Sequence, residues 1–192
     1  MLQTLLDRMA RYEAPGASVD AAVLIALTRE TVPRMILTLR AGHMNSHAGE
    51  VAFPGGKCDA TDASVIATAL READEEIGLS PDKVKVIGEL GVFTSRIGLK
   101  VRPVIGMIDE LPVLTPNPDE IESIFTVPLD HFLNHQPSYE HKIKFMGLPI
   151  TVPSYDYQGY MIWGLTGYMI VELMRLVYDA DIDWRWPNPL KR

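Results

Sequence analysis

At positions 71–79 the chain reads Arg71-Glu72-Ala73-Asp74-Glu75-Glu76-Ile77-Gly78-Leu79, and a glycine-rich turn, Phe53-Pro54-Gly55-Gly56, comes shortly before it. If the run is helical, each residue advances by about 100°. With Val65 at zero, Glu75, Glu72 and Glu76 fall at roughly 280°, 340° and 20°, whereas apolar side chains fill roughly 0° to 140°. The three carboxylates therefore border the predicted core, and Glu76 overlaps its edge.

Carboxylates at this spacing repel one another by a few tenths of a kcal/mol per pair, and by more where water is excluded. A bound divalent cation is the simplest compensation, because hard cations take oxygen ligands. We therefore expect Glu72, Glu75 and Glu76 to hold a metal ion, with Glu72 and Glu76 as the best ligand pair. The alternative is a solvated helix face on which Arg71 pairs with the glutamates.

The composition is that of an ordinary globular protein, with 47% apolar and 22% charged residues in 192 positions. We expect one domain over 1–192, with an N-terminal helix and linker at 1–18 and a tail at 179–192. The net charge of −7 argues against nonspecific nucleic-acid binding, because no basic surplus is present to meet phosphates. A single cysteine excludes an internal disulfide and fits a reducing compartment.

The N-terminal segment is amphipathic and lacks the apolar core of a signal peptide. The longest apolar stretch, residues 162–178, contains Glu172 and Arg175 and is too short to span a bilayer. We therefore expect a cytoplasmic protein that has no membrane partner. The apolar surface of the same stretch permits a homodimer, although a monomer core would use the same residues.

Hydrophobic patterning and turn residues predict alternating strands and helices. The expected strands cover 21–27, 34–40, 51–53, 84–94, 101–108 and 121–127, with a hairpin over 141–146 and 149–152. The expected helices cover 2–12, a segment that begins after Asp62 or Ser64 and ends at Ile77, a short segment after Pro128, and 163–178. This order predicts an α/β fold with a mixed sheet and helices on both faces.

The glycine turn followed by the glutamate helix resembles the Nudix box of the Nudix hydrolases, written G-x5-E-x7-R-E-U-x-E-E-x-G-U with U a bulky aliphatic. Gly56 opens the box, and its last part is complete in Arg71, Glu72, Glu75, Glu76, Gly78 and Leu79. The middle acid is Asp62 instead of glutamate, with eight residues before Arg71. The resemblance implies a Nudix-type α/β/α sandwich that hydrolyses a diphosphate linkage with Mg²⁺ or Mn²⁺.

A narrower resemblance, to the coenzyme A diphosphatase branch, rests on the upstream pattern L-L-T-x-R-S-x3-R-x3-G-x3-F-P-G-G. Residues 36–40, Gly49 and 53–56 match it, whereas Ala41 replaces the serine and Asn45 the second arginine. The branch implies cleavage of coenzyme A into phosphopantetheine and adenosine 3′,5′-bisphosphate. The alternatives are another nucleoside diphosphate derivative, namely a dinucleotide, ADP-ribose or a nucleotide sugar, and a non-catalytic nucleotide-binding module.

The resemblance also assigns roles to individual residues. The expected catalytic residues are Arg71, Glu75 and Glu120, with Glu120 a candidate general base. The expected substrate-binding residues are Arg40, Gly55 and Gly56, and the Gly55 carbonyl is a further candidate metal ligand. Weaker candidates for phosphate contact are Arg96, Lys100, Arg102, His43 and His47. His131 and His135 lack a third metal ligand nearby, and we expect Tyr155, Tyr157, Tyr160 and Trp163 to be core or interface residues.

Overall fold

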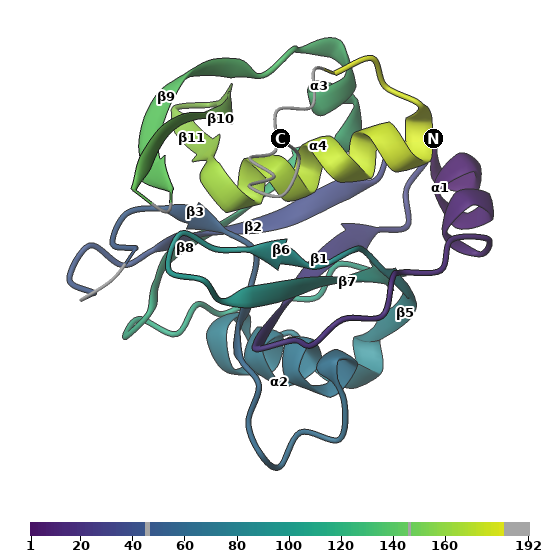
Figure 1. Ribbon diagram of the computed structural model, residues 1–192. Helices are drawn as coiled ribbons and strands as arrows, with labels where there is room; N and C mark the ends of the chain where they lie inside the picture. Colours follow the sequence, from purple (N-terminus) through teal and green to yellow (C-terminus); the bar gives the residue numbers. More distant parts are fainter. Residues whose placement is uncertain (45–46, 146, 183–192) are drawn as a thin grey trace.

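The computed structural model of the protein describes residues 1–44, 47–145 and 147–182 (Figure 1). Within these residues a mixed eight-stranded sheet forms the centre of the molecule. Its strands are β1 (Ala21–Thr28), β2 (Arg34–Arg40), β3 (Val51–Ala52), β4 (Gly55–Lys57), β5 (Val84–Glu89), β6 (Phe93–Thr94), β7 (Lys100–Ile108) and β8 (Ile121–Pro128). The main path runs β3-β2-β1-β7-β5, and β4, β6 and β8 pair with β1, β7 and β2 respectively.

Strands β1 and β7 pair in parallel, with Ala21 opposite Val101 and Thr28 opposite Ile108, whereas the other pairs of this sheet are antiparallel. Both faces of β1 are covered, which explains why its sequence is a continuous apolar run instead of an alternating one. The predicted mixed sheet with helices on both faces is confirmed.

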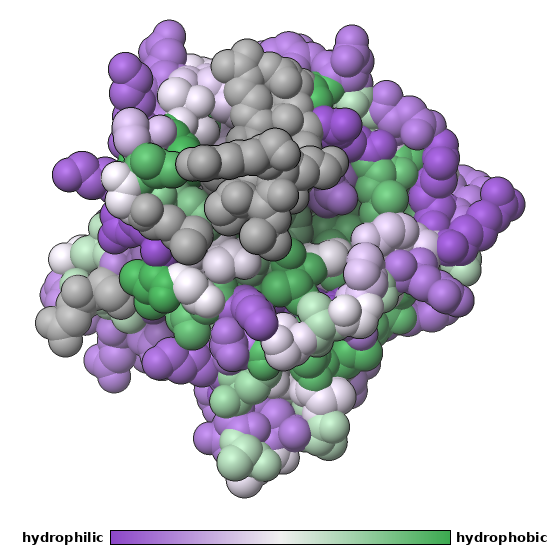
Figure 2. Space-filling view, in the orientation of Figure 1, coloured by the Kyte–Doolittle hydropathy of each residue, from purple (hydrophilic) through white to green (hydrophobic). Residues whose placement is uncertain are grey.

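The sheet separates two apolar cores. On one face lies α2 (Val65–Ile77), whose Ala69, Ala73 and Ile77 pack against Leu24 and Val104 of the sheet. On the other face lie α1 (Leu2–Met9), α4 (Gly164–Tyr178) and a smaller sheet (Figure 1). Figure 2 shows apolar surface gathered near the middle of one face of the molecule, with hydrophilic side chains around most of its edge.

Helix α2 begins and ends where the sequence predicted. Ser64 is the N-cap, and its Oγ accepts a hydrogen bond from the backbone N–H of Ala67 at 3.1 Å. Gly78 ends the helix in the left-handed conformation, with φ +65°, and its N–H bonds to the carbonyls of Ala73 and Asp74. These two caps fix the length of the helix that carries the three glutamates.

The smaller sheet contains the predicted hairpin, β9 (Ser138–Phe145) and β10 (Leu148–Tyr157), together with β11 (Tyr160–Trp163), which was not predicted. Short helix α3 (Leu129–Asn134) follows Pro128 as expected, and a 3₁₀ turn, η1 (Pro81–Lys83), precedes β5. The apolar side chains of α4 are buried within the same chain, so its composition does not require a partner subunit. In the described part of the chain, none of the helices is long and apolar enough to cross a bilayer.

The structure corrects three element predictions. Residues 84–94 form two strands, because the chain leaves the sheet after Glu89 and returns at Phe93. The predicted turn at Gly55 and Gly56 is itself a short strand that pairs with β1. Helix α1 ends at Met9 and does not extend to 12. The predicted packing of the tail at 184–187 lies outside the described residues.

Candidate active site

The most buried acid of the predicted site is Glu76, which is 2% exposed. Its Oε2 accepts a hydrogen bond from the backbone N–H of Gly55 at 3.1 Å. A Cβ on Gly55 would lie 2.4 Å from the Ala22 carbonyl oxygen, so a glycine is needed for the backbone to pack this closely on β1. The glycine turn and the glutamate helix are therefore joined by a direct contact.

Glu72 lies against the second glycine of the turn. A Cβ on Gly56 would lie 2.5 Å from the Glu72 carboxyl group, so only glycine leaves this carboxylate its position. Side-chain exposure rises from 3% for Glu76 through 17% for Glu72 to 58% for Glu75. This order is the one that the helical wheel predicts, with Glu76 at the edge of the core and Glu75 farthest from it.

Arg71 holds the carboxylates from the solvent side. Its Nη1 donates to Glu72 Oε1 and to Glu75 Oε2, both at 2.9 Å, and its Nη2 donates to the Lys57 carbonyl at 3.2 Å. Its Nε and Nη2 form a two-pronged contact with Asp62 at 3.0 and 3.1 Å. The pKa of Arg71 is raised because hydrogen bonds and charges of these acids stabilise the guanidinium.

Asp62, the predicted middle acid, thus contacts Arg71 despite the extra residue in the spacing. It also accepts hydrogen bonds from the Thr68 hydroxyl and the Asp59 N–H, each at 2.8 Å. The hydrogen bond from Arg71, with these others, holds the pKa of Asp62 well below its usual range. The loop before α2 absorbs the added residue, and the acid still reaches Arg71.

Arg40 joins the predicted general base to the carboxylate cluster. Its Nη1 lies 3.2 Å from Glu76 Oε1, and its Nη2 lies 3.4 Å from Glu120 Oε2. The Arg40 side chain is 16% exposed and that of Glu120 44%. The structure therefore brings together the predicted residues of the α2 helix, the glycine turn, β2 and the loop before β8.

Burial governs the protonation of the inner carboxylates. Desolvation raises the pKa of Glu76 to about 7, and the negative charges of Glu120 and Glu72 also raise it. The hydrogen bond from the Gly55 N–H and the positive charge of Arg40 act in the opposite direction, because they favour the charged form. Desolvation also raises the pKa of Glu72, although Arg71 opposes it. A cation at this place would lower the free-energy cost of burying the charged Glu72 and Glu76 carboxylates, which Arg71 and Arg40 offset only in part.

The oxygen atoms of the glutamate cluster suit a hard divalent cation, because they are carboxylate oxygens next to the backbone of the glycine turn, without sulfur or imidazole ligands. Within the described residues, however, no three His, Cys, Asp or Glu side chains are already grouped around one ion position. In this arrangement Arg71 is paired with Glu72 and Glu75, and Arg40 with Glu76. Glu72, Glu75 and Glu76 are the residues that could hold an ion here.

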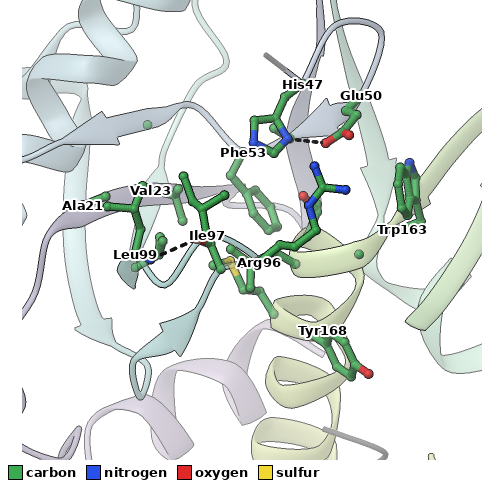
Figure 3. Close-up of a pocket in the computed structure, with 18 of the residues that line it drawn as sticks. Ala21, Val23, His47, Glu50, Phe53, Arg96, Ile97, Leu99, Trp163 and Tyr168 are labelled. Carbon is green, nitrogen blue, oxygen red and sulfur yellow. Dashed lines mark hydrogen bonds and ion pairs between the residues drawn. The ribbon is translucent and has the colours of Figure 1, made fainter. Parts of the chain in front are cut away.

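A cavity of about 390 Å³ adjoins the glycine turn (Figure 3). Arg40, Gly55 and Gly56 belong both to its wall and to the carboxylate cluster. The remaining wall comes from β3, the loop between β6 and β7, the smaller sheet and the start of α4, and includes His47, Glu50, Phe53, Arg96, Ile97, Trp163 and Tyr168. Sequence reasoning missed this cavity because its wall combines segments that are distant along the chain.

The three basic residues predicted to contact phosphate, Arg96, Lys100 and Arg102, lie in different surroundings. Arg96 lines the cavity. Lys100 instead donates from Nζ to the Ser18 Oγ at 2.6 Å. Arg102 is buried, donates to the carbonyls of Leu90 and Pro15, and pairs with Glu89 at 3.5 Å. The burial and contacts of Arg102 argue against its predicted phosphate contact, whereas Lys100 lies off the cavity wall and its phosphate contact stays a prediction.

The histidines lie in different surroundings. The rings of His131 and His135 are tilted by 31° with centroids 4.5 Å apart, and the His131 Nε2 contacts the Asp156 carbonyl at 3.0 Å. The His43 Nε2 lies 3.1 Å from the Asp119 carbonyl, whereas His47 lines the cavity.

The aromatic residues predicted to be core or interface residues also lie in different surroundings. Tyr155 is a core residue and Tyr160 stacks on Phe125. Trp163 packs against the core, as predicted, and also lies on the cavity wall.

Comparison with known proteins shows the family of the chain. Residues 18–147 match the NUDIX domain family. The chain is 40% identical over 178 residues to "Uncharacterized Nudix hydrolase NudL" of Enterobacter sp. (strain 638), covering 88% of this chain and 93% of that protein. It is 41% identical over 157 residues to the protein of the same name from Photorhabdus laumondii, covering 82% and 84%.

Two solved structures share the fold. The Nudix hydrolase RenU of M. smegmatis superposes with a TM-score of 0.50 at 20% identity, covering 60% of this chain and 74% of that one. A MutT/nudix family protein from Enterococcus faecalis gives 0.50 at 17% identity, covering 93% and 70%. The chain belongs to the Nudix hydrolase family. It is a hydrolase that acts on pyrophosphate bonds.

Proposed function

We propose that the protein is a metal-dependent diphosphatase of coenzyme A or its derivatives, with phosphopantetheine and adenosine 3′,5′-bisphosphate as products. The observation that carries the proposal is the convergence of Glu72 and Glu76 on the Gly55-Gly56 turn, at a cavity that Arg40 also lines. A diphosphate bound at this turn would lie beside Arg40 and beside the carboxylates that would hold the ion.

Nudix hydrolases generally use divalent ions, and Mg²⁺ or Mn²⁺ is the cofactor proposed here. When bound, the ion neutralises phosphate charge and acidifies the attacking water. Glu72 and Glu76 would be its protein ligands, with the Gly55 carbonyl as a further one. Glu75 is exposed and oriented by Arg71 at 2.9 Å, so it can ligate an ion or orient water.

Glu120 is the proposed general base, and Arg71 is better described as a positioning residue than as a catalytic one. Glu120 lies in the loop just before β8, half-exposed, and its carboxylate is oriented by Arg40. An exposed carboxylate beside the cluster can accept a proton from water. Arg71 instead donates hydrogen bonds to Asp62, Glu72, Glu75 and the Lys57 carbonyl, and these bonds hold the proposed metal ligands in place.

The choice of coenzyme A rests on the branch pattern, whose Arg40, Phe53, Gly55 and Gly56 all line the cavity. Because Ala41 departs from the pattern, ADP-ribose, a dinucleotide or a nucleotide sugar stays as the alternative substrate. The Ala41 side chain is buried, 4% exposed, so a serine hydroxyl at this position would face the protein interior. The departure at Asn45 lies outside the described residues. A non-catalytic module is disfavoured, because all three helix glutamates are present.

The test is a substrate panel in H₂¹⁸O with mass-spectrometric identification of the products. Coenzyme A, ADP-ribose and NADH are compared under one Mg²⁺ and one Mn²⁺ condition. We expect coenzyme A to have the highest kcat/KM, and Glu76→Gln to lower it about 100-fold or more while circular dichroism stays unchanged. Asp74→Asn, on the exposed face of the same helix, is the matched control. Faster turnover of ADP-ribose or NADH would select the alternative, and full activity of Glu76→Gln would refute the metal assignment.

A further inference from the structure

The cavity beside the carboxylate cluster has arginines at two separate points of its wall. Arg40 lies at the diphosphate end, since it contacts the Glu76 carboxylate that also accepts the Gly55 N–H bond. Arg96 comes from another segment, the loop between β6 and β7 (Figure 3). The two cations therefore mark two places where an anionic group of one ligand can be bound.

Arg96 is available for such a contact. Within the described part of the chain, its side chain makes no hydrogen bond or ion pair, whereas His47 on the same wall is paired with Glu50 at 2.7 Å. The loop that carries Arg96 is nevertheless ordered by its own hydrogen bonds: the Ser95 N–H donates to the Leu99 carbonyl at 2.7 Å, and the Leu99 N–H to the Ser95 Oγ at 3.1 Å. An arginine on a defined loop, facing a cavity without a carboxylate partner, is a suitable counter-ion for a phosphate.

The rest of the wall is apolar and partly aromatic. Phe53 and Trp163 both line the cavity, and Figure 3 shows them with Arg96 around the same space. One neighbour of the Trp163 ring is His141, with centroids 4.9 Å apart. Aromatic rings on a cavity wall provide a stacking surface for a nucleobase, which has a π-face of its own.

The two halves of coenzyme A differ in just these properties. One half, adenosine 3′,5′-bisphosphate, has an aromatic base and a second phosphate remote from the diphosphate. The other half, phosphopantetheine, has no charge beyond its single phosphate and no ring. We infer that the cavity binds the adenosine 3′,5′-bisphosphate half, with Trp163 beside the adenine and Arg96 paired with the 3′-phosphate; the inference rests on the proposed action on coenzyme A. ADP-ribose and NADH lack the 3′-phosphate, so Arg96 is a specificity-determining residue.

The experiment is calorimetric titration of the full chain, in EDTA, with adenosine 3′,5′-bisphosphate, with 5′-AMP and with phosphopantetheine. The wild type binds the bisphosphate about tenfold more tightly than 5′-AMP, since an arginine–phosphate pair contributes on this scale. Arg96→Gln abolishes the preference and Arg96→Lys keeps part of it. Lys100→Gln, which removes a cation of the same loop region from outside the cavity wall, leaves it unchanged.

Equal affinities of the wild type for the bisphosphate and 5′-AMP would overturn the inference. The inference also fails if Arg96→Gln retains the preference, or if phosphopantetheine displaces the bisphosphate at lower concentration. The readout does not depend on hydrolysis. A protein that prefers the bisphosphate through Arg96 but fails to cleave coenzyme A with Mg²⁺ or Mn²⁺ would refute the proposed function and leave the cavity assignment intact.

Discussion

At the scale of single residues, the site depends on two glycines: Gly55 lets the turn pack closely on β1, and Gly56 leaves room for the Glu72 carboxylate. The wheel predicted the order in which Glu76, Glu72 and Glu75 are exposed, because helical periodicity alone fixes their angles to the core. The contacts of Arg40 with Glu76 and Glu120 could not be predicted in this way, since they join segments up to 80 positions apart. The sequence indicated which residues form the site, but not which of them touch.

Gly56 gives a direct test of this close approach. We expect Gly56→Ala to displace the Glu72 carboxylate, because the added Cβ would lie 2.5 Å from it, and to lower metal-dependent hydrolysis about 100-fold. Gly16→Ala, where the added atom meets nothing within 4 Å, is the control. Steady-state kinetics at saturating Mg²⁺ measures both variants. Unchanged kinetics in Gly56→Ala would mean that the packing of Glu72 on the turn has no role.

The raised pKa of Glu76 predicts a pH dependence of stability in the metal-free protein. Its pKa is about 7 in the folded state and 4.5 ordinarily, so the folded state holds the proton more tightly than the unfolded state. The free energy of unfolding should therefore fall between about pH 4.5 and pH 7, by roughly 2 kcal/mol, as this proton is lost. Urea unfolding in EDTA at pH 5 and pH 7.5 measures the difference.

Glu76→Gln removes the titrating group and should flatten this dependence, so that the variant gains stability relative to the wild type as the pH rises. The low pKa of Asp62 does not interfere, because its stabilisation is lost only as the pH falls towards and below its ordinary pKa of 3.8. A wild type and variant with parallel pH profiles would show that Glu76 is not held in its neutral form.

At the scale of elements, helix α2 is the part that local sequence determines best. Its first and last residues follow from Ser64 and Gly78, and its buried face follows from the spacing of Ala69, Ala73 and Ile77. The hairpin of β9 and β10 was likewise predictable from alternation around Gly147. Strands β4 and β11 were not, because segments of three and four residues have no periodic signal and exist through their partners.

The caps of α2 carry a measurable part of the stability. Ser64→Ala should lower the free energy of unfolding by about 1 kcal/mol, since the Ala67 N–H loses its acceptor. Gly78→Ala should cost about 1 kcal/mol as well, because alanine is strained at φ +65°. Ser64→Asp and Gly78→Asn, which suit the same positions, should recover most of the loss in urea denaturation. Equal stability of Ser64→Ala and the wild type would mean that the cap contributes nothing.

At the scale of the whole molecule, the central sheet places the acids of α2 next to the wall of the cavity. Helix α2 supplies acids on one side of the glycine turn, and β6, the smaller sheet and α4 supply the cavity wall on the other. The fold class and the acids could be predicted from the sequence. The cavity wall could not, because it depends on how α4 and the smaller sheet pack over β3, which no local pattern encodes.

The most direct test of the central claim is anomalous diffraction from crystals grown with Mn²⁺. The claim is that the carboxylates of α2 bind a divalent ion beside the glycine turn. We predict an anomalous peak at coordination distance, roughly 2.0–2.4 Å, from the Glu72 and Glu76 carboxylate oxygens. The peak should be lost in Glu72→Gln/Glu76→Gln and retained in Asp74→Asn. A peak elsewhere, or none beside α2 in the wild type, would contradict the account.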